Sequence, residues 1–238
     1  MAIKKVELPK KYEYVEGETP EEFKKYHGRN KISYSQYSSW HSMYKGSYLA
    51  QYFLGIEEDS GIFADFGTKC GEYLEKLDRS DLSDNDVEIL DSIESPRDAH
   101  YEKEVVIDLK PFGVDAVLQG FIDRRMEDKI GVDIRDFKTG AAKKEGFYAS
   151  EEYQQTTLYS YFEDIAGNII TYSGVILFPR KGNGTEKHPL RLEGEPIFIE
   201  TPYTRKRAED VLKKIAKTCI EISDYYKMYN ELFLDVQD

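Results

Sequence analysis

The spacing of hydrophobic residues changes from a helical to a strand-like period near residue 100. Between residues 34 and 77, apolar and aromatic side chains recur at steps of three and four, which predicts helices. One stripe, expected to begin at a Ser35 N-cap, contains Tyr37, Trp40, Tyr44, Tyr48 and Tyr52. A second helix is expected over residues 61–77. Beyond residue 100, short β-branched runs bounded by Gly, Pro and Asp predict strands over 102–109, 116–126 and 130–138.

The remaining segments continue this mixture of helices and strands. We expect a helix from Ser150 to Gly167, strands over 169–178 and 196–200 around a basic loop, and a long amphipathic helix over 204–232. Residues 1–30 have no clear period and are expected to form an irregular arm. Residues 78–96 form an acidic connector with room for one helical turn. The order predicts one α/β domain over residues 1–238, with a mixed central sheet flanked by helices and helical elaborations at both ends.

Composition restricts the partners and cofactors that are expected. The chain has 238 residues and a net charge of −12, which argues against broad nonspecific nucleic-acid binding but allows a local basic groove. No apolar run approaches the roughly 20 residues of a membrane span, and the N-terminus lacks a signal-peptide stretch, so a cytoplasmic protein without membrane contacts is expected. Cys70 and Cys219 are too few for an iron–sulfur cluster and are expected to be buried thiols.

Two predicted strands carry charges that need an explanation. Asp136 and Lys138 lie two residues apart and therefore point to the same side of a strand, whereas Arg135 and Phe137 point to the other. If the strands around residues 127–131 form a hairpin, Asp123 lies near Asp136. Two adjacent carboxylates repel each other unless they are protonated or bridged by a cation, and oxygen donors suit Mg²⁺ or Mn²⁺. Solvent-exposed ion pairs on a polar hairpin are the alternative interpretation.

The spacing of these residues resembles a known family. Gly120-x-x-Asp123 followed by Asp136-x-Lys138-Thr-Gly resembles the motifs of the PD-(D/E)XK nuclease superfamily, in its RecB-like exonuclease branch. The segments "ISYSQYSSW" and "FGTKCGEYLE" resemble helices of that branch, and Gln155 and Tyr159 reproduce its Gln-x-x-x-Tyr motif. The resemblance covers roughly residues 30–165.

The resemblance implies a restriction-endonuclease-like fold and a metal-dependent reaction. It assigns Asp123 and Asp136 to binding divalent metal, Lys138 to assisting the attacking water, and Gln155 and Tyr159 to positioning the metal site or the nucleic-acid backbone. The expected product carries a 5′-phosphate. Four-cysteine relatives hold an iron–sulfur cluster, which is not expected in this chain.

One position departs from the family pattern. The branch usually has a metal-ligating histidine where this chain has Gly71. Glu72 is one residue later, and Glu75 is one helical turn later on the same face, so either glutamate could supply an oxygen ligand. The sequence slightly favours Glu72, because an empty position 71 leaves room for its side chain to swing across. In the alternative, both glutamates are solvated and the enzyme is impaired.

Nucleic-acid contacts require concentrated positive charge in so acidic a chain. The candidates are Lys143 and Lys144, Arg180 and Lys181, and Arg205 with its basic neighbours, although solvated surface positions explain each equally simply. The aromatic stripe could stack bases, but core packing is the favoured interpretation.

The prediction is a Mg²⁺- or Mn²⁺-dependent DNA nuclease, an exonuclease acting at DNA ends in recombination, repair or phage DNA metabolism of a bacterial or infected cell. The two alternatives are a catalytically impaired nucleic-acid-binding module and an interaction subunit of a nuclease–helicase complex. A helicase or recombination protein is the expected protein partner.

Overall fold

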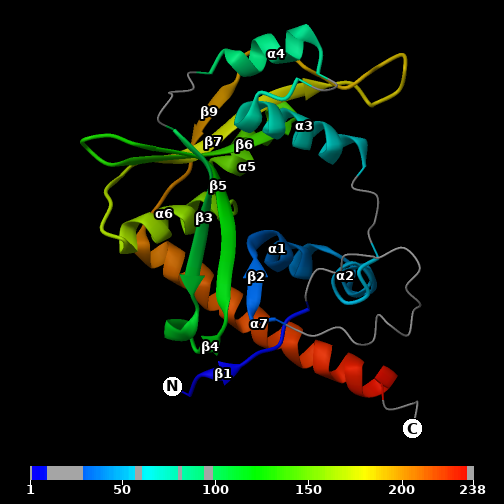
Figure 1. Cartoon of the computed structure of the whole chain (residues 1–238), viewed down its shortest axis with the longest axis vertical. Helices are drawn as coiled ribbons and strands as arrows, with labels where there is room; N and C mark the ends of the chain where they lie inside the picture. The colour runs from blue at the N-terminus through cyan, green and yellow to red at the C-terminus, as the bar shows by residue number, and fades with distance from the viewer. Residues whose placement is uncertain (1, 10–28, 57–60, 80–81, 94–98, 235–238) are drawn as a thin grey trace. The chain divides into compact units, whose positions relative to one another are not determined.

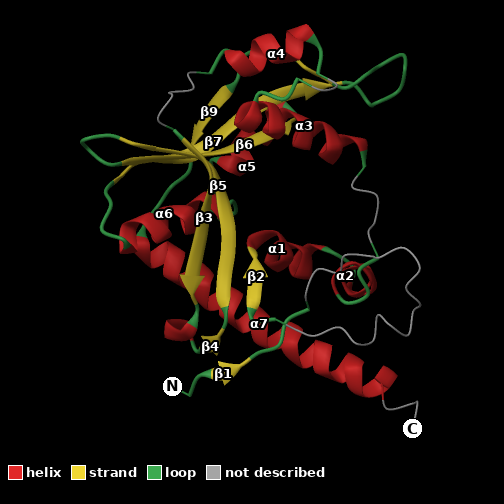
Figure 2. Cartoon of the chain, in the orientation of Figure 1, coloured by secondary structure: helices red, strands yellow, loops and turns green. Residues whose placement is uncertain are grey.

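Groups of helices and groups of strands follow one another along the chain, as Figures 1 and 2 show. The computed structural model describes residues 2–9, 29–56, 61–79, 82–93 and 99–234. The helices are α1 (Tyr34–Ser42), α2 (Lys45–Tyr52), α3 (Ile62–Lys76), α4 (Asp84–Asp91), α5 (Glu145–Tyr148), α6 (Gln155–Ile165) and α7 (Arg205–Leu234), with short 3₁₀ turns η2 (Lys110–Phe112) and η3 (Ala142–Lys144). The strands are β1 (Lys4–Lys5), β2 (Lys31–Ser33), β3 (His100–Asp108), β4 (Val114–Asp115), β5 (Val117–Glu127), β6 (Val132–Gly140), β7 (Ile170–Lys181), β8 (Arg191–Leu192) and β9 (Ile197–Glu200).

The chain divides into two compact units. The first consists of residues 1–59, 106–120 and 209–238, and the second of residues 60–105 and 121–208. Strands β3 and β5 and helix α7 contribute residues to both units. None of the described helices combines the length and apolar character needed to cross a membrane.

The second unit contains a mixed sheet centred on β6 and β7. Strand β5 pairs antiparallel with β6, β6 pairs parallel with β7, and β8 and β9 both pair antiparallel with β7 (Figure 2). The run from Ser173 to Phe178 is buried at every position, because helices cover both faces of β7. The predicted mixed α/β architecture is confirmed.

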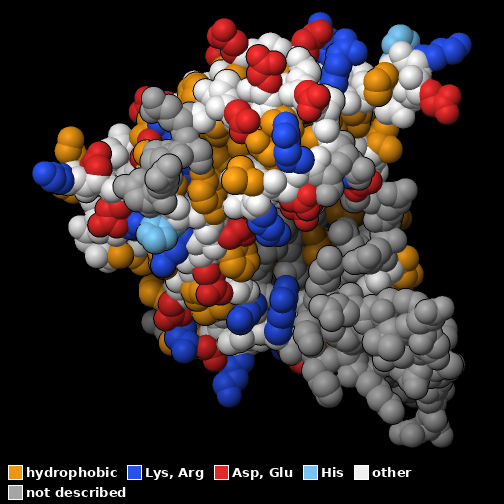
Figure 3. All heavy atoms as spheres, turned by 45° about the horizontal axis from the view of Figure 1, so that its top comes forward, with side chains coloured by type: hydrophobic (Ala, Val, Ile, Leu, Met, Phe, Trp, Pro, Cys, Tyr) orange, Lys and Arg blue, Asp and Glu red, His pale blue; other side chains and the backbone are white. Residues whose placement is uncertain are grey.

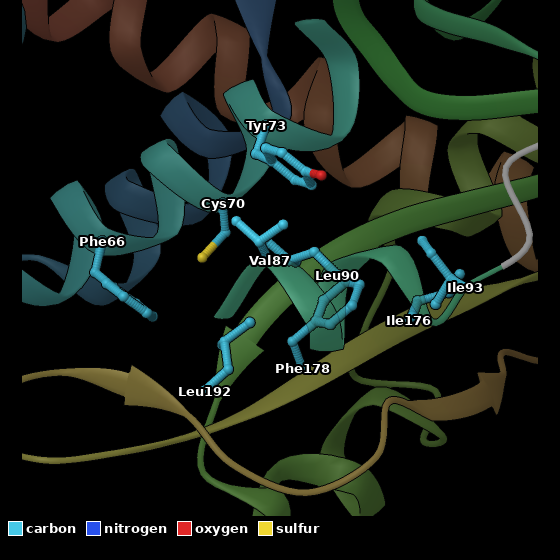
Figure 4. Close-up of a cluster of buried hydrophobic side chains, with 9 residues drawn as sticks. All are labelled: Phe66, Cys70, Tyr73, Val87, Leu90, Ile93, Ile176, Phe178 and Leu192. Atoms are coloured by element: carbon cyan, nitrogen blue, oxygen red, sulfur yellow. The ribbon is translucent and has the colours of Figure 1, made fainter. Parts of the chain in front are cut away.

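Alternate residues of β7 face two separate hydrophobic clusters. Ile176 and Phe178 pack with α3, α4 and β8 in a cluster that includes Phe66, Cys70 and Tyr73 (Figure 4). On the other side, a smaller cluster contains the following residues: Val175, Leu177, Tyr148, Tyr153 and Ile199. Packing of α3 against this sheet fixes the helix that carries the candidate glutamates.

The segment before α6 corrects one predicted helix. The helix expected from Ser150 begins at Gln155 instead. Ser150 does not cap it: its hydroxyl donates to the carbonyl of Phe147 at 2.7 Å and accepts from the backbone N–H of Glu152 at 3.2 Å. These bonds form a local turn, and the buried side chain of Tyr153 ties that turn to the sheet.

The acidic connector also contains more structure than expected. Helix α4 occupies residues 84–91, because Ser83 and Asp86 form a reciprocal capping box. The buried Asp86 carboxylate also accepts a hydrogen bond from the backbone N–H of Leu192 at 2.6 Å, which fastens the helix to β8.

The first unit contains the aromatic residues near the N-terminus and most of α7. The predicted Ser35 cap and single helical stripe are wrong: Ser33 caps α1, accepting from the N–H of Gln36 at 3.1 Å, and Tyr44 is extended between α1 and α2. Trp40 and Tyr48 are buried with ring centroids 4.9 Å apart, which fits the core-packing interpretation for those two residues. Tyr44 is exposed.

The two ends of the chain are described to different extents. The helix predicted over residues 204–232 is α7, drawn in orange to red in Figure 1. Most of the predicted N-terminal arm, residues 10–28, lies outside the described residues. Cys219 of α7 and Cys70 of α3 are both buried free thiols, as predicted, and burial raises the pKa of each to about 12.

Candidate active site

Strands β5 and β6 bring Asp123 next to Asp136. Their ladder pairs Arg124 with Arg135, and continuing that register by one step would place the two aspartates opposite each other. Asp123 Oδ2 accepts a hydrogen bond from the backbone N–H of Phe137 at 2.6 Å, so its carboxylate projects across to β6. Burial and the charge of Asp136 raise the pKa of Asp123 well above its usual range, although Lys138 and the Phe137 N–H act in the opposite direction.

Asp136 is fully buried and lies between a lysine and a tyrosine. Its Oδ2 pairs with the ammonium of Lys138 and accepts a hydrogen bond from the hydroxyl of Tyr153 at 2.7 Å. Its Oδ1 has no hydrogen-bond partner within the described structure. A buried carboxylate oxygen without a donor is costly, and a cation could satisfy it.

Lys138 is positioned to act as a positive charge. Its side chain is 30% exposed and lies at the wall of a cavity of about 620 Å³. Burial alone would lower the pKa of Lys138, but the charges of Asp136 and Asp123 raise it above its usual value. The amine is therefore an ammonium at neutral pH in this arrangement.

Helix α6 places Gln155 and Tyr159 beside the aspartates. Gln155 Nε2 donates to the hydroxyl of Tyr159 at 2.8 Å, and the Tyr153 hydroxyl is 3.4 Å from Gln155 Oε1. Burial and the negative charge of Asp136 raise the pKa of Tyr159. The Gln-x-x-x-Tyr pair thus connects to Asp136 through Tyr153.

Two residues of this region were missed in the sequence. The sequence pattern predicts Tyr153 inside a helix and Glu102 in a strand, and it assigns neither residue a function. Glu102 lines the same cavity as Glu75, Asp123 and Lys138. Nothing in local spacing distinguishes either residue, because both reach the site through contacts between distant segments.

Of the two candidate glutamates, Glu75 is the one that interacts with other site residues. The Glu75 and Glu102 carboxyl groups are close enough to share a hydrogen bond when one of them is protonated. Burial, followed by the charge of Glu102, raises the pKa of Glu75 to about 7. Glu72 also lines the cavity but is exposed.

The donor set of this cavity suits a hard divalent cation. Among residues 2–9, 29–56, 61–79, 82–93 and 99–234, no three Asp, Glu, His or Cys side chains are already gathered around one point as metal ligands. Asp136 is instead paired with Lys138, and Glu75 with Glu102. The oxygen donors, the raised carboxyl pKa values and the unpartnered Oδ1 of Asp136 fit Mg²⁺ or Mn²⁺.

The candidate basic residues differ in what they contact. Lys143 and Lys144 are exposed on η3. The guanidinium of Arg180 stacks on the Phe63 ring at 4.1 Å, and its Nε and Nη1 have no hydrogen-bond partner within the described structure. Phe63 also lines the cavity.

The other two candidates are already paired. Lys181 contacts Glu193, and Arg205 makes two hydrogen bonds of 2.8 Å to the carboxylate of Asp164. On the face shown in Figure 3, acidic and basic side chains are interspersed, so no single sign of charge dominates that face.

Comparison with known proteins assigns the family. The family model of the PD-(D/E)XK nuclease superfamily matches residues 86–231, a range that includes the aspartate pair, Lys138 and the Gln155–Tyr159 pair. The chain belongs to the PD-(D/E)XK nuclease superfamily. Nucleases of this superfamily generally use divalent metals such as Mg²⁺ or Mn²⁺, and the observed mixed sheet flanked by helices is consistent with their restriction-endonuclease-like fold.

The comparison with solved structures adds a likeness at low sequence identity. A solved structure titled "Crystal structure of SSO0001" is 16% identical, with a TM-score of 0.46, and the match covers 85% of this chain and 81% of that one. No curated protein sequence matches this chain significantly.

Proposed function

We propose that this chain is a Mg²⁺- or Mn²⁺-dependent DNA nuclease of the RecB-like branch that hydrolyses phosphodiester bonds at DNA ends. The observation that carries the proposal is the contact between Lys138 and the buried Asp136, with Asp123 on the neighbouring strand. The order of Gly120-x-x-Asp123, Asp136-x-Lys138 and Gln155-x-x-x-Tyr159 supports the branch. Recombination, repair or phage DNA metabolism is the proposed setting, with a helicase or recombination protein as a partner.

The proposed metal ligands are Asp123, Asp136 and Glu75. A bound cation polarises the phosphodiester, favours ionisation of water and shields negative charge. Glu75 is preferred to Glu72 because it is half-buried and lies one helical turn from position 71 on the same face, whereas Glu72 is exposed.

The other residues of the site position groups or supply charge. Tyr153 holds Asp136 through its hydroxyl, and the Gln155–Tyr159 pair supports Tyr153. The Lys138 ammonium lines the cavity, where it can donate hydrogen bonds to a phosphate oxygen as negative charge increases there. Arg180, Lys143 and Lys144 are the proposed contacts to the DNA backbone.

Cleavage assays with defined DNA ends test this proposal. Linear DNA labelled at either end and covalently closed circular DNA are incubated with the protein and Mg²⁺, Mn²⁺ or EDTA. We expect metal-dependent degradation of linear DNA, an intact circle, and products with 5′-phosphates that a ligase can join. Cleavage of the circle would reject exonuclease action, and binding without cleavage would identify a nucleic-acid-binding module.

Matched variants test the assigned residues. Asp136→Asn should abolish cleavage, whereas Lys138→Ala should slow it by about 10²-fold or more while Mn²⁺ binding stays near normal. Asp133→Asn is the control, because Asp133 lies on the same strand but pairs with Arg135. Wild-type cleavage by Asp136→Asn would contradict the proposed site.

A further inference from the structure

Glu102 has an unusual backbone conformation for its place in the fold. Among the described residues, Glu102 and Leu77 are the non-glycine residues with positive φ, at 52° and 58°. Leu77 is the C-cap of α3, where a left-handed residue is common. Glu102 lies within β3, where a positive φ is sterically unfavourable for a residue with a β-carbon. Such strain is typically retained where a side chain has a functional task.

Glu102 is an exposed residue that borders the candidate metal cavity. It lines that cavity together with Glu75 of α3 and Asp123 of β5. Its carboxyl group is close enough to Glu75 for the two to share a hydrogen bond when one is protonated, and its charge acts on Asp123. Glu102 therefore lies next to both the helix-borne and the strand-borne carboxyl groups.

The arrangement matters because position 71, where the resemblance to the RecB-like branch implies a histidine ligand, is a glycine. Two carboxyl groups in contact at the wall of a polar cavity repel each other when both are ionised, and a cation between them removes that repulsion. Asp136 does not line the cavity, but it pairs with Lys138, which does, and its fully buried Oδ1 lacks a hydrogen-bond partner in the described structure, so a positive ligand could be accommodated there.

We propose that Glu102 is an additional metal ligand, and that Glu75 and Glu102 together take the place of the missing histidine at Gly71. The proposal rests on the proposed metal-dependent function. It makes the donor set entirely carboxylate, with Asp123 and Asp136 as the other members. Such a site favours the hard cations Mg²⁺ and Mn²⁺ over softer metals that prefer nitrogen.

Calorimetric titration with Mn²⁺ in the absence of DNA tests the proposal. Glu102→Gln retains the length of the side chain but removes its charge, and should weaken Mn²⁺ binding by about tenfold or more. Glu104→Gln is the matched control on the same strand, and its affinity should stay within about twofold of wild type. Mn²⁺ affinity of Glu102→Gln equal to that of Glu104→Gln would overturn the proposal.

A second variant separates metal binding from a structural role. Glycine adopts positive φ readily, so Glu102→Gly should lose Mn²⁺ affinity while the metal-free protein melts at an equal or higher temperature. A lower melting temperature with unchanged Mn²⁺ affinity would show that Glu102 is structural and would reject the proposal.

Asp136→Asn in the same titration distinguishes this inference from the proposed function. Loss of Mn²⁺ binding in Asp136→Asn but not in Glu102→Gln would reject only the role of Glu102. Unchanged binding in both variants would reject the proposed metal site as a whole.

Discussion

The carboxylate of Glu75 lies over Gly71, with Oε1 3.9 Å from the point where a β-carbon at position 71 would stand. The side chain one helical turn later thus occupies space beside the empty position. Glu72, which the sequence slightly favours as the ligand, is exposed. Helical phase therefore favours Glu75, because a residue one position along the helix is rotated by about 100°.

Gly71→His should restore a nitrogen ligand without disturbing the helix. A β-carbon there meets only ordinary contacts, and replacing this helical glycine should stabilise the fold by about 0.5–1 kcal/mol in Gly71→Ala and by less in Gly71→His. We expect Mn²⁺ affinity to rise relative to Mg²⁺ affinity, because imidazole suits the softer ion better. Calorimetry with both metals measures the ratio of Mn²⁺ affinity to Mg²⁺ affinity. Gly71→Ala is the control, because it stabilises the helix without adding a metal ligand. Equal ratios in the two variants would show that position 71 does not reach the metal.

Tyr153→Phe should disturb the site through Asp136. The variant removes the 2.7 Å hydrogen bond to a buried carboxylate, which should lower the free energy of unfolding by about 1.5–3 kcal/mol. Mn²⁺ affinity or cleavage should fall by about 10- to 100-fold, the range for partners that orient a ligand. Tyr148→Phe is the matched control, since that ring is also buried and packs 5.1 Å from Tyr153. Similar metal affinities in the two variants would reject a positioning role.

Arg180→Ala should weaken DNA binding more than Arg205→Ala. The guanidinium of Arg180 stacks on Phe63 of the cavity, and its buried Nε and Nη1 have no hydrogen-bond partner among the described residues, whereas Arg205 is held by Asp164. Fluorescence anisotropy with labelled DNA at several salt concentrations should show the salt slope falling by about one for Arg180→Ala. Arg205→Ala should leave that slope unchanged. A larger loss of DNA binding in Arg205→Ala than in Arg180→Ala would place the DNA contact at the start of α7.

The metal-free protein should become less stable as pH rises toward neutrality. The pKa of Glu75 is raised from 4.5 to about 7, so between these values the folded protein holds a proton that the unfolded chain has lost. The free energy of unfolding should therefore decrease as pH rises through this window, and the contribution should level off above it. Mn²⁺ affinity should increase over the same window, because the cation competes with the proton.

Urea denaturation in EDTA between about pH 5 and pH 8 measures this effect. Glu75→Gln removes the titrating group and should flatten the profile. Some slope should remain, because Asp123 also has a raised pKa and acts with the same sign. A wild-type profile as flat as that of Glu75→Gln would contradict the raised pKa.

The strands, and the order of the chemical groups along them, were predictable from local sequence pattern. Runs of β-branched residues identified β5, β6 and β7, because strand formation depends on local side-chain pattern. Alternation put Asp136 and Lys138 on the same side of β6, and their ion pair agrees with it. The short turn before β6 made the proximity of Asp123 and Asp136 predictable as well.

Packing between distant segments governs which other groups reach those aspartates, and local sequence pattern does not reveal it. Tyr153 contacts Asp136 because the chain turns before α6 begins, and local helix signals placed that start at Ser150. Glu102 reaches Glu75 through a left-handed residue inside a strand, which propensity cannot anticipate for glutamate. Contacts between segments distant in sequence depend on packing and backbone strain, and neither leaves a periodic signal in the sequence.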